Sequence, residues 1–439
     1  MPHRPTRRQF VSTTAAAGMG FWLAGGLQAK ESKSPNERIR MASIGIGGKG
    51  SSDSSDAGKN GDMVAICDTD KKRLGLAAEK RYTKAKTYTD FRKLLDEMGK
   101  SIDAVTVSTP DHTHAPAALM AMRMGKHCFC QKPLTKSIYE ARLMGKVAAE
   151  TGVATMMGNQ GTAADGLRES AAILKGGSMG KVTEVHVWTN RPIWPQNGKG
   201  RPKPASCPET LDWQSWLGPV ADQPYAHGYH PFAWRGWWDF GTGALGDMAC
   251  HNVNMSFAGL DLRNPTSVIA KTSGHQKISF PKWSVIEFEF PANDKRPGLK
   301  LFWYDGGKLP PEKALDGVLK DGEKLNLNGT LVISDKAKLY LVGDSKIRLV
   351  GMDRPKVEYE KSPGHFAEWV RAIKGGKQAM SNFKDYAGPL TETILLGNLA
   401  VWVDGQEVEW DAKNLKAKNI PGLEELVKPV YHKGYTLDV

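Results

Sequence analysis

The chain has 439 residues, 40% hydrophobic and 24% charged, which is the composition of a globular protein with about two domains. Lys and Arg outnumber Asp and Glu by 60 to 47, but they are spread along the chain without a basic run between aromatic residues, so we expect no nucleic-acid partner. No segment beyond the first thirty residues is long and apolar enough to span a membrane. The five cysteines fit no zinc spacing, and we expect no metal.

The first thirty residues follow the order of an export signal. Arg7 and Arg8 precede the weakly apolar stretch from Ala15 to Leu23, and small and polar residues follow. An arginine pair before such a stretch resembles a twin-arginine signal, and the alternative is a disordered basic tail. We therefore expect residues 1–30 to be a signal, residues 31–37 to be a linker, and the mature protein to be exported to the periplasm.

Residues 38–157 are expected to form a Rossmann domain that binds NAD(P). Short apolar strands alternate there with amphipathic helices, and this order predicts right-handed βαβ units and a parallel sheet. The expected strands are 40–45, 62–68, 102–108, 128–130 and 153–157, and the expected helices are 71–82, 91–98, 114–124 and 138–151.

Residues 158–439 show the pattern of an α+β domain with a large, mostly antiparallel open sheet, which we expect to bind substrate and to mediate oligomerisation. Proline, glycine and tryptophan are frequent from Pro192 to Gln223, which we interpret as a long ordered loop because Trp194, Trp213 and Trp216 favour burial. The expected strands are 182–189, 267–272, 284–290, 300–304, 330–334 and 338–342, and the expected helices are 165–174, 364–373 and 390–403.

A glycine-rich turn follows the first predicted strand. Gly45, Gly47 and Gly50 match G-x-G-x-x-G, and Asp68 ends the next strand at about the distance expected for the acid that binds the ribose 2′-hydroxyl. Such glycines permit the tight turn, the approach of the pyrophosphate and the packing of the next helix, although the residues after Gly50 are polar and poor helix formers. The carboxylate favours NAD, while the basic residues 71–73 leave NADP possible. The alternative is an ordinary glycine turn.

Two further segments carry candidate catalytic side chains. Lys132 follows the fourth predicted strand, at the edge of the sheet where such folds bind ligands. Asp247 and His251 are four residues apart and would share a helix face, with His251 as proton acceptor and Asp247 as an orienting carboxylate. The alternatives are a surface lysine and a structural Asp–His pair.

Together these motifs resemble the Gfo/Idh/MocA family of oxidoreductases (glucose–fructose oxidoreductase, inositol dehydrogenase and rhizopine catabolism proteins). Their order and spacing match over about residues 38–260. The segments that carry the resemblance are Gly45–Gly50, Ser108-Thr109-Pro110 with His114, Lys132-Pro133, Gly158-Asn159-Gln160, and Asp247 with His251.

The resemblance implies a role for each matching residue. Lys132 would contact the nicotinamide ribose and the substrate hydroxyl, Asp247 would bind that hydroxyl, and His251 would take its proton. Gln160 would lie near the nicotinamide. The remaining cofactor contacts would be Gly45, Gly47, Gly50 and Asp68, with Thr109, Pro110 and His114 on the ribose and adenine side.

One position departs from the family pattern. Relatives usually have Glu-Lys-Pro, whereas Gln131 precedes Lys132 here beside the expected cofactor. Glutamine can orient the lysine by hydrogen bonds but supplies no negative charge to hold its proton. The substitution therefore casts doubt on a plain dehydrogenase cycle.

The aromatic stretch from residue 229 to 239 offers candidate substrate contacts. Aromatic faces stack on sugar rings and arginine binds carboxylates or hydroxyls, so Tyr229, His230 and Arg235 are the candidates. The alternative is that these side chains fill a core or an oligomer contact.

We expect an NAD(P)-dependent enzyme that removes a hydride from a C–OH carbon of a sugar, glycoside or cyclitol. An exported enzyme has no access to cytosolic NAD, so a tightly bound cofactor would have to be recycled in each turnover. The alternative is therefore an NAD-dependent glycoside hydrolase that oxidises, eliminates and re-reduces. A non-catalytic nucleotide- or sugar-binding protein is the third possibility. By analogy with other sheet-containing domains, we expect a homo-oligomer.

Overall fold

The computed structural model describes residues 38–197 and 200–437, which form two sheets with helices packed on them. The predicted signal and linker lie outside the described residues. Within the described residues, no helix combines the length and the apolar character needed to cross a bilayer.

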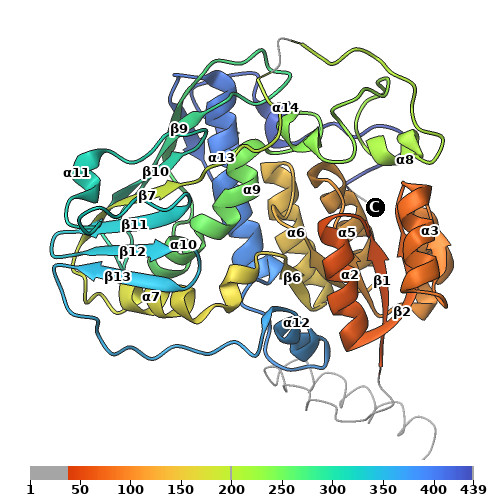
Figure 1. Cartoon of the computed structure of the whole chain (residues 1–439), viewed down its shortest axis with the longest axis horizontal. Helices are drawn as coiled ribbons and strands as arrows, with labels where there is room; N and C mark the ends of the chain where they lie inside the picture. Colours follow the sequence, from red (N-terminus) through yellow and green to blue (C-terminus); the bar gives the residue numbers. More distant parts are fainter. Residues whose placement is uncertain (1–37, 198–199, 438–439) are drawn as a thin grey trace, which may run out of the picture.

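The N-terminal sheet has six parallel strands in the order β3-β2-β1-β4-β5-β6, which confirms the predicted Rossmann arrangement (Figure 1). Only the short β3 was not expected. Its strands are β1 (Ile39–Ile44), β2 (Gly61–Cys67), β3 (Lys86–Tyr88), β4 (Ala104–Val107), β5 (His127–Cys130) and β6 (Thr155–Met157). The helices that connect them are α2 (Lys49–Asn60), α3 (Lys71–Lys80), α4 (Phe91–Met98), α5 (His114–Arg123) and α6 (Ile138–Thr151).

Helix α2 forms despite its polar sequence. Asp53, Ser54 and Ala57 point into the protein, and Asp53 finds buried partners on neighbouring strand ends. At Gly50 an added Cβ would lie 2.0 Å from the carbonyl oxygen of Gly45, so only glycine allows the helix to start against β1. Tertiary contacts therefore outweigh the weak helix propensity of this segment.

The second sheet has nine strands in the order β13-β12-β11-β7-β10-β9-β8-β14-β15, and only the β7–β10 pair is parallel. The mostly antiparallel sheet is as predicted, with three additional strands at its edges. The strands are β7 (Val182–Trp188), β8 (Ser267–Thr272), β9 (Ser284–Phe290), β10 (Leu299–Tyr304), β11 (Gly329–Ser334), β12 (Lys338–Val342), β13 (Lys346–Val350), β14 (Val408–Asp411) and β15 (Lys416–Ala417).

Helices α9 (Gly243–Asn252) and α13 (Gly388–Val403) lie between the second sheet and the Rossmann domain (Figure 1). Because α13 packs on α6, α9 and β8, one apolar core runs through both halves of the molecule. The other helices of this half are α7 (Asp165–Lys175), α8 (Trp213–Leu217), α10 (Asn254–Leu260), α11 (Glu312–Leu315), α12 (His365–Ile373) and α14 (Glu424–Val427).

Helix α12 belongs to the second half of the chain but packs on the Rossmann sheet. Trp369 is fully buried against Phe129 of β5, with its indole N–H donating to the carbonyl oxygen of Ala154 at 3.2 Å. The two halves are therefore joined by α12 as well as by α13.

The loop from Pro192 to Gln223 is ordered where it is described, as its tryptophans predict. Trp194 and Trp216 are buried, and Trp213 stacks on Trp216 with ring centres 4.8 Å apart. The segment before α8 is hydrogen-bonded to the start of α3, from Lys71 N to Thr210 O at 2.8 Å, so the second half reaches over the carboxyl edge of the parallel sheet (Figure 1).

Candidate active site

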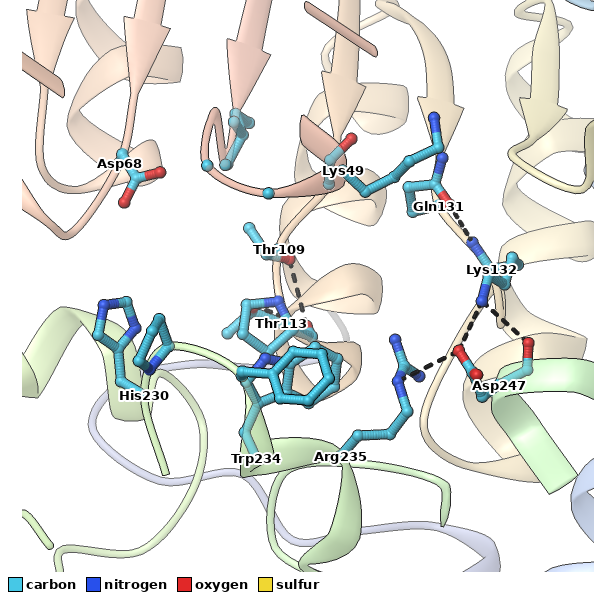
Figure 2. A pocket seen from close by; sticks show the side chains of 18 of the residues that line it. Lys49, Asp68, Thr109, Thr113, Gln131, Lys132, His230, Trp234, Arg235 and Asp247 are labelled. Carbon is cyan, nitrogen blue, oxygen red and sulfur yellow. Dashed lines mark hydrogen bonds and ion pairs between the residues drawn. The ribbon is translucent and has the colours of Figure 1, made fainter. Parts of the chain in front are cut away.

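A cavity of about 800 Å³ lies between the two halves, at the carboxyl edge of the parallel sheet. Figure 2 shows side chains from both halves pointing into it. The turns after β1, β2, β4, β5 and β6 all contribute lining residues, because the carboxyl ends of parallel strands meet at one edge of the sheet. The opposite wall comes from α9 and from the loop that follows β7.

The glycine turn forms one side of this cavity. Gly45 has φ +79°, and an added Cβ would lie 2.7 Å from the carbonyl oxygen of Ser108, so no other residue fits there. Gly48 has φ +53° and nothing within 4 Å of an added Cβ, which leaves its backbone open toward the cavity. The exposed backbone at the start of α2 is the form of site that receives the pyrophosphate of a dinucleotide.

Acidic residues mark one end of the cavity, which we call the adenosine end. Asp68 is buried, and its two carboxylate oxygens accept hydrogen bonds from the backbone N–H of Ile46 (3.0 Å) and of Asp70 (2.9 Å). Burial raises the pKa of the Asp68 carboxyl, and these hydrogen bonds oppose the rise. His230 comes from the opposite wall, with Nε2 3.3 Å from Asp70 Oδ2.

At the other end, which we call the substrate end, Lys132 and Asp247 form an ion pair (Figure 2). Lys132 Nζ lies 2.7 Å from Asp247 Oδ1 and 2.9 Å from the Asp247 carbonyl oxygen, although the two residues are 115 positions apart. Arg191 Nε and Arg235 Nε each lie 3.4 Å from the same carboxylate. Burial opposes ionisation of Asp247, but the charges of Arg235 and Lys132 outweigh it and hold the pKa of this carboxyl well below its usual value.

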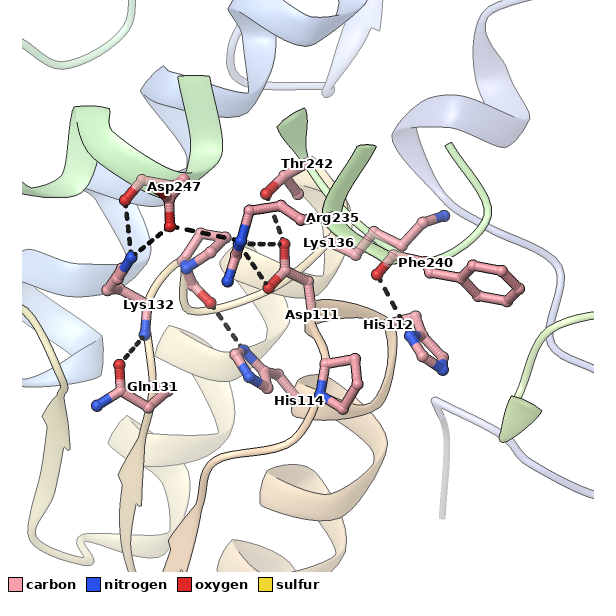
Figure 3. Close-up of polar contacts among 12 residues, drawn as sticks. Asp111, His112, His114, Gln131, Lys132, Lys136, Arg235, Phe240, Thr242 and Asp247 are labelled. Atoms are coloured by element: carbon pink, nitrogen blue, oxygen red, sulfur yellow. Dashed lines mark hydrogen bonds and ion pairs between the residues drawn. The ribbon is translucent and has the colours of Figure 1, made fainter. Parts of the chain in front are cut away.

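Arg235 is itself held by a buried acid that sequence analysis did not identify. Its Nη1 donates to both oxygens of Asp111 at 3.0 Å, and Thr242 Oγ1 donates to Asp111 Oδ2 at 2.6 Å (Figure 3). Asp111 directly follows the Ser108-Thr109-Pro110 segment, which is the only sequence signal that pointed toward it. A chain of alternating charges therefore runs from the Rossmann domain to α9.

His251 lies one helical turn beyond Asp247 on α9 and lines the same cavity, as its spacing predicts. Burial, with the nearby charge of Lys132, lowers the pKa of the imidazole to about 3. The ring makes no hydrogen bond within the described part of the chain. A neutral imidazole with a free nitrogen can accept a proton from a substrate hydroxyl.

The other predicted site residues divide into two groups. Thr109, Pro110, Gln131 and Gln160 line the cavity with Gly45, Gly47 and Asp68. His114, Gly50 and Tyr229 lie behind its surface. The His114 ring spans the carbonyl oxygens of Pro133 and Thr109, each 2.8 Å away, and so braces the turn that carries Lys132.

Tyr229 is 2% exposed and packs among aromatic residues of the loop, with its ring centre 5.0 Å from that of Phe240. Within this stretch, His230 and Arg235 line the cavity, whereas Tyr229 and Trp237 belong to a core cluster. Composition alone does not tell the two groups apart.

Comparison with known proteins gives the same two-part division. Residues 39–159 match the oxidoreductase family model described as an NAD-binding Rossmann fold, and residues 174–295 match the model for the C-terminal alpha/beta domain of that family. The chain belongs to the Gfo/Idh/MocA family of oxidoreductases.

Its similarity to individual relatives is partial. The chain is 31% identical over 120 residues (27% of this chain, 33% of that protein) to an inositol 2-dehydrogenase of Rubrobacter xylanophilus. It is 29% identical over 154 residues (31% and 35%) to a glycosyl hydrolase family 109 protein of Solibacter usitatus. The chain thus spans about a third of the length of the curated relatives it matches.

Among solved structures, an inositol dehydrogenase homologue of Azotobacter vinelandii in complex with NADH and myo-inositol has the same fold. The TM-score is 0.56 at 14% identity, covering 85% of this chain and 98% of the other.

The structure accounts for the family departure at position 131. Gln131 Nε2 donates to Asp53 Oδ2 at 2.9 Å, and Gln131 Oε1 accepts from the Lys132 backbone N–H at 3.2 Å. Asp53 also accepts from Ser108 Oγ at 2.8 Å and pairs with Lys49. A glutamate at 131 would face this buried carboxylate, whereas the amide bonds to it. The ammonium of Lys132 pairs with Asp247 instead, so its counter-charge does not depend on residue 131.

Proposed function

We propose that this protein is an NAD-dependent oxidoreductase that removes a hydride from a C–OH carbon of a sugar, glycoside or cyclitol. The observation that carries the proposal is the placement of Lys132, Asp247 and His251 in the cavity that the glycine turn also lines. A dinucleotide cradle and a proton-accepting group in one enclosed space are what dehydrogenation of an alcohol requires.

Each side chain has a distinct part in this proposal. When bound, NAD would supply the hydride acceptor at its nicotinamide. Lys132, held by Asp247, would donate a hydrogen bond to the substrate oxygen and stabilise the negative charge that develops on it. His251, neutral because of its low pKa, would receive the hydroxyl proton as the C–H bond breaks.

We propose that the cofactor is NAD and that it is retained through turnover. Asp68 and Asp70 lie together at the adenosine end, where carboxylates repel a 2′-phosphate, and the Arg73 guanidinium lies 3.5 Å from Asp70. Backbone hydrogen bonds tie the β2–α3 turn to the loop of the second half, from Lys71 N to Thr210 O (2.8 Å) and from Asp212 N to Thr69 O (2.9 Å). Trp216, His230 and Tyr435 line this end as well.

This closure favours a second candidate function, an internal redox cycle on a glycoside. A cofactor that does not exchange has to be re-reduced or re-oxidised in each turnover. Transient oxidation of a glycoside acidifies the neighbouring C–H, so that elimination of the aglycone and re-reduction regenerate the starting cofactor. The similarity to a glycosyl hydrolase family 109 protein is in accord with this cycle.

One experiment tests the cofactor, and a second separates the two reactions. The purified protein is denatured, and the released nucleotide is identified by mass spectrometry and quantified. We expect one mole of NAD per mole of protein. Adding free sugars and aryl glycosides should then give either net NADH or an aglycone without net NADH. A protein that neither contains nor binds NAD or NADP would refute the proposal.

We further propose that the protein is exported by the twin-arginine route and acts in the periplasm as a homo-oligomer. The arginine pair Arg7-Arg8 carries the first part, so replacing both with lysine should leave the protein in the cytoplasm. The mass of the periplasmic protein would show whether residues up to Ala29 are removed, and light scattering would give the oligomeric state.

A further inference from the structure

Asp344 is a half-buried acid of the cavity that the proposed mechanism does not use. It lies in the turn between β12 and β13, in the second half of the chain, and lines the cavity together with Gly343. No motif pointed to it, since it is a single aspartate in a polar turn.

The tip of this hairpin is held against the segment that follows β6 and against the start of α7. A Cβ added to Gly161 would lie 2.4 Å from Asp344 Oδ1, and a Cβ added to Gly166 would lie 2.4 Å from the carbonyl oxygen of Ser345. The backbone N–H of Leu167 donates to the Asp344 carbonyl oxygen at 3.0 Å. Two close glycine contacts and one backbone hydrogen bond therefore fix where the Asp344 carboxylate lies.

Two independent sets of contacts place this carboxylate at the substrate end. Along the first, Gly161 follows Gln160, and Asn159 Nδ2 donates at 3.4 Å to the carbonyl oxygen of Cys250, which precedes His251. The segment that Asp344 contacts is thus hydrogen-bonded to the helix that carries His251.

The second set runs along the sheet. Gly329 of β11 pairs with Val342 of β12, so Asn328 and Gly343 lie at the same end of these strands. Thr189 Oγ1 donates to Asn328 Oδ1 at 2.6 Å and accepts from the backbone N–H of Arg191 at 3.3 Å. Arg191 in turn contacts Asp247.

The Asp344 carboxylate differs from the other acids of the cavity because it has no partner. Asp68, Asp90 and Asp247 each accept hydrogen bonds from backbone or cationic groups. In the described parts of the chain, no side chain or backbone group donates to the Asp344 carboxylate. Burial alone raises the pKa of this carboxyl. Even partial burial of a carboxylate without a protein donor is unfavourable, so a half-buried, fixed and unpartnered one in a ligand cavity indicates a donor that arrives with the ligand.

We propose that Asp344 is a second substrate-binding carboxylate, opposite Asp247, that accepts hydrogen bonds from ring hydroxyls of the sugar or cyclitol. This assignment rests on the proposed function, since it gives a subsite for the same substrate. The ligand class it selects is a polyhydroxylated ring with free hydroxyls on the carbons away from the reacting one. Two carboxylates on different elements would fix the ring by hydroxyls at two points, which defines the carbon presented to His251.

The test compares Asp344→Asn with wild type in the cofactor-loaded protein. Asparagine has the same shape but no charge, and nothing in the described structure donates to the group it replaces, so the variant should fold. D-glucose, myo-inositol and methyl β-D-glucopyranoside serve as probes, with binding followed by the fluorescence of the cavity tryptophans Trp194 and Trp234. Ser345→Ala at the same tip is the matched control.

We expect Asp344→Asn to weaken the binding of the best probe by about 10- to 100-fold, the range for lost hydrogen bonds to a charged acceptor. The midpoint of thermal unfolding of the sugar-free protein should stay the same or rise, because an unpaired, half-buried charge is removed. Ser345→Ala should change neither property.

Three other results have distinct meanings. Wild-type affinity in Asp344→Asn would overturn the subsite and leave the proposed function intact. Parallel losses of sugar binding, bound nucleotide and thermal stability would overturn it too, because they indicate a structural role. A wild-type protein that holds nucleotide but binds none of the probes would refute the sugar-directed function and, with it, the subsite.

Discussion

The two ends of the cavity are built from different interactions. At the substrate end, Asp247 is surrounded by Lys132, Arg191 and Arg235, so charged side chains from both halves of the chain converge on one carboxylate. At the adenosine end, backbone hydrogen bonds and aromatic rings join the loop after β7 to the β2–α3 turn. The difference indicates that the first end is organised for chemistry and the second for holding the nucleotide.

Removing a side chain from the substrate end should have the largest effect on turnover. We expect Lys132→Ala and His251→Ala each to lower kcat by about 100- to 10,000-fold, the usual contribution of a positioned acid–base group. Both variants should still contain nucleotide, since neither residue lies at the adenosine end. Measuring kcat checks the loss of turnover, and mass spectrometry of the nucleotide released on denaturation checks that it is retained. Wild-type rates in both variants would contradict the assigned roles.

Acid should destabilise the protein, because two histidines are held neutral: His251 at the substrate end, and the buried His112, which packs on Trp216. Burial lowers the pKa of His112 to about 4, and that of His251 to about 3. The unfolded chain therefore binds more protons below pH 6.5, and the free energy of unfolding falls as the pH drops from about 6.5 toward 4. Each unit of pKa shift corresponds to about 1.4 kcal/mol.

Urea unfolding at pH 7 and pH 5 measures this loss. His112 holds the loop through contacts to the carbonyl oxygens of Trp216 (2.9 Å) and Phe240 (3.2 Å). In His112→Gln the difference between the two pH values should be smaller than in wild type. An equal difference would mean that this histidine is already protonated in the folded protein at pH 5.

A pair of substitutions should separate the Gln131–Asp53 contact from the ion pair of Lys132. Gln131→Glu would bring two buried carboxylates to the distance now spanned by a 2.9 Å hydrogen bond, and we expect a loss of about 1–3 kcal/mol in unfolding free energy. Adding Asp53→Asn restores one donor and one acceptor, so the double variant should regain most of that stability. Additive losses in the double variant would contradict the contact.

The smallest expected effect is at the rim of the adenosine end. Tyr435 lines the cavity, with the Arg92 guanidinium 4.3 Å from its ring centre. Tyr435→Ala should release nucleotide about fivefold faster in gel filtration or dialysis, because one aromatic contact is worth about 1 kcal/mol. Tyr359 does not line the cavity, so Tyr359→Ala is the control. If the nucleotide is released at the wild-type rate, the loop that follows β7, and not Tyr435, limits its release.

The fold could be predicted from local sequence patterns. Alternation of apolar strands and amphipathic helices, together with the glycine turn, identified the Rossmann sheet, and the Asp247–His251 spacing identified a shared helix face. The polar α2 was a poor helix by composition and forms because Asp53 finds buried partners. Weakly patterned edges such as β3 and β13–β15 were missed, since two- to five-residue strands leave little periodicity.

By itself, the sequence determined which residues follow each strand of a parallel sheet, and hence that Gly45, Asp68, Thr109 and Lys132 would share one edge. Only the tertiary structure decided which distant residues meet them. Asp111, Arg191 and Asp344 are isolated charges in turns, and nothing local distinguishes them from solvated surface residues. Their roles arise from neighbours that are distant in the chain, because electrostatic interactions depend on distance in space rather than on position in the chain.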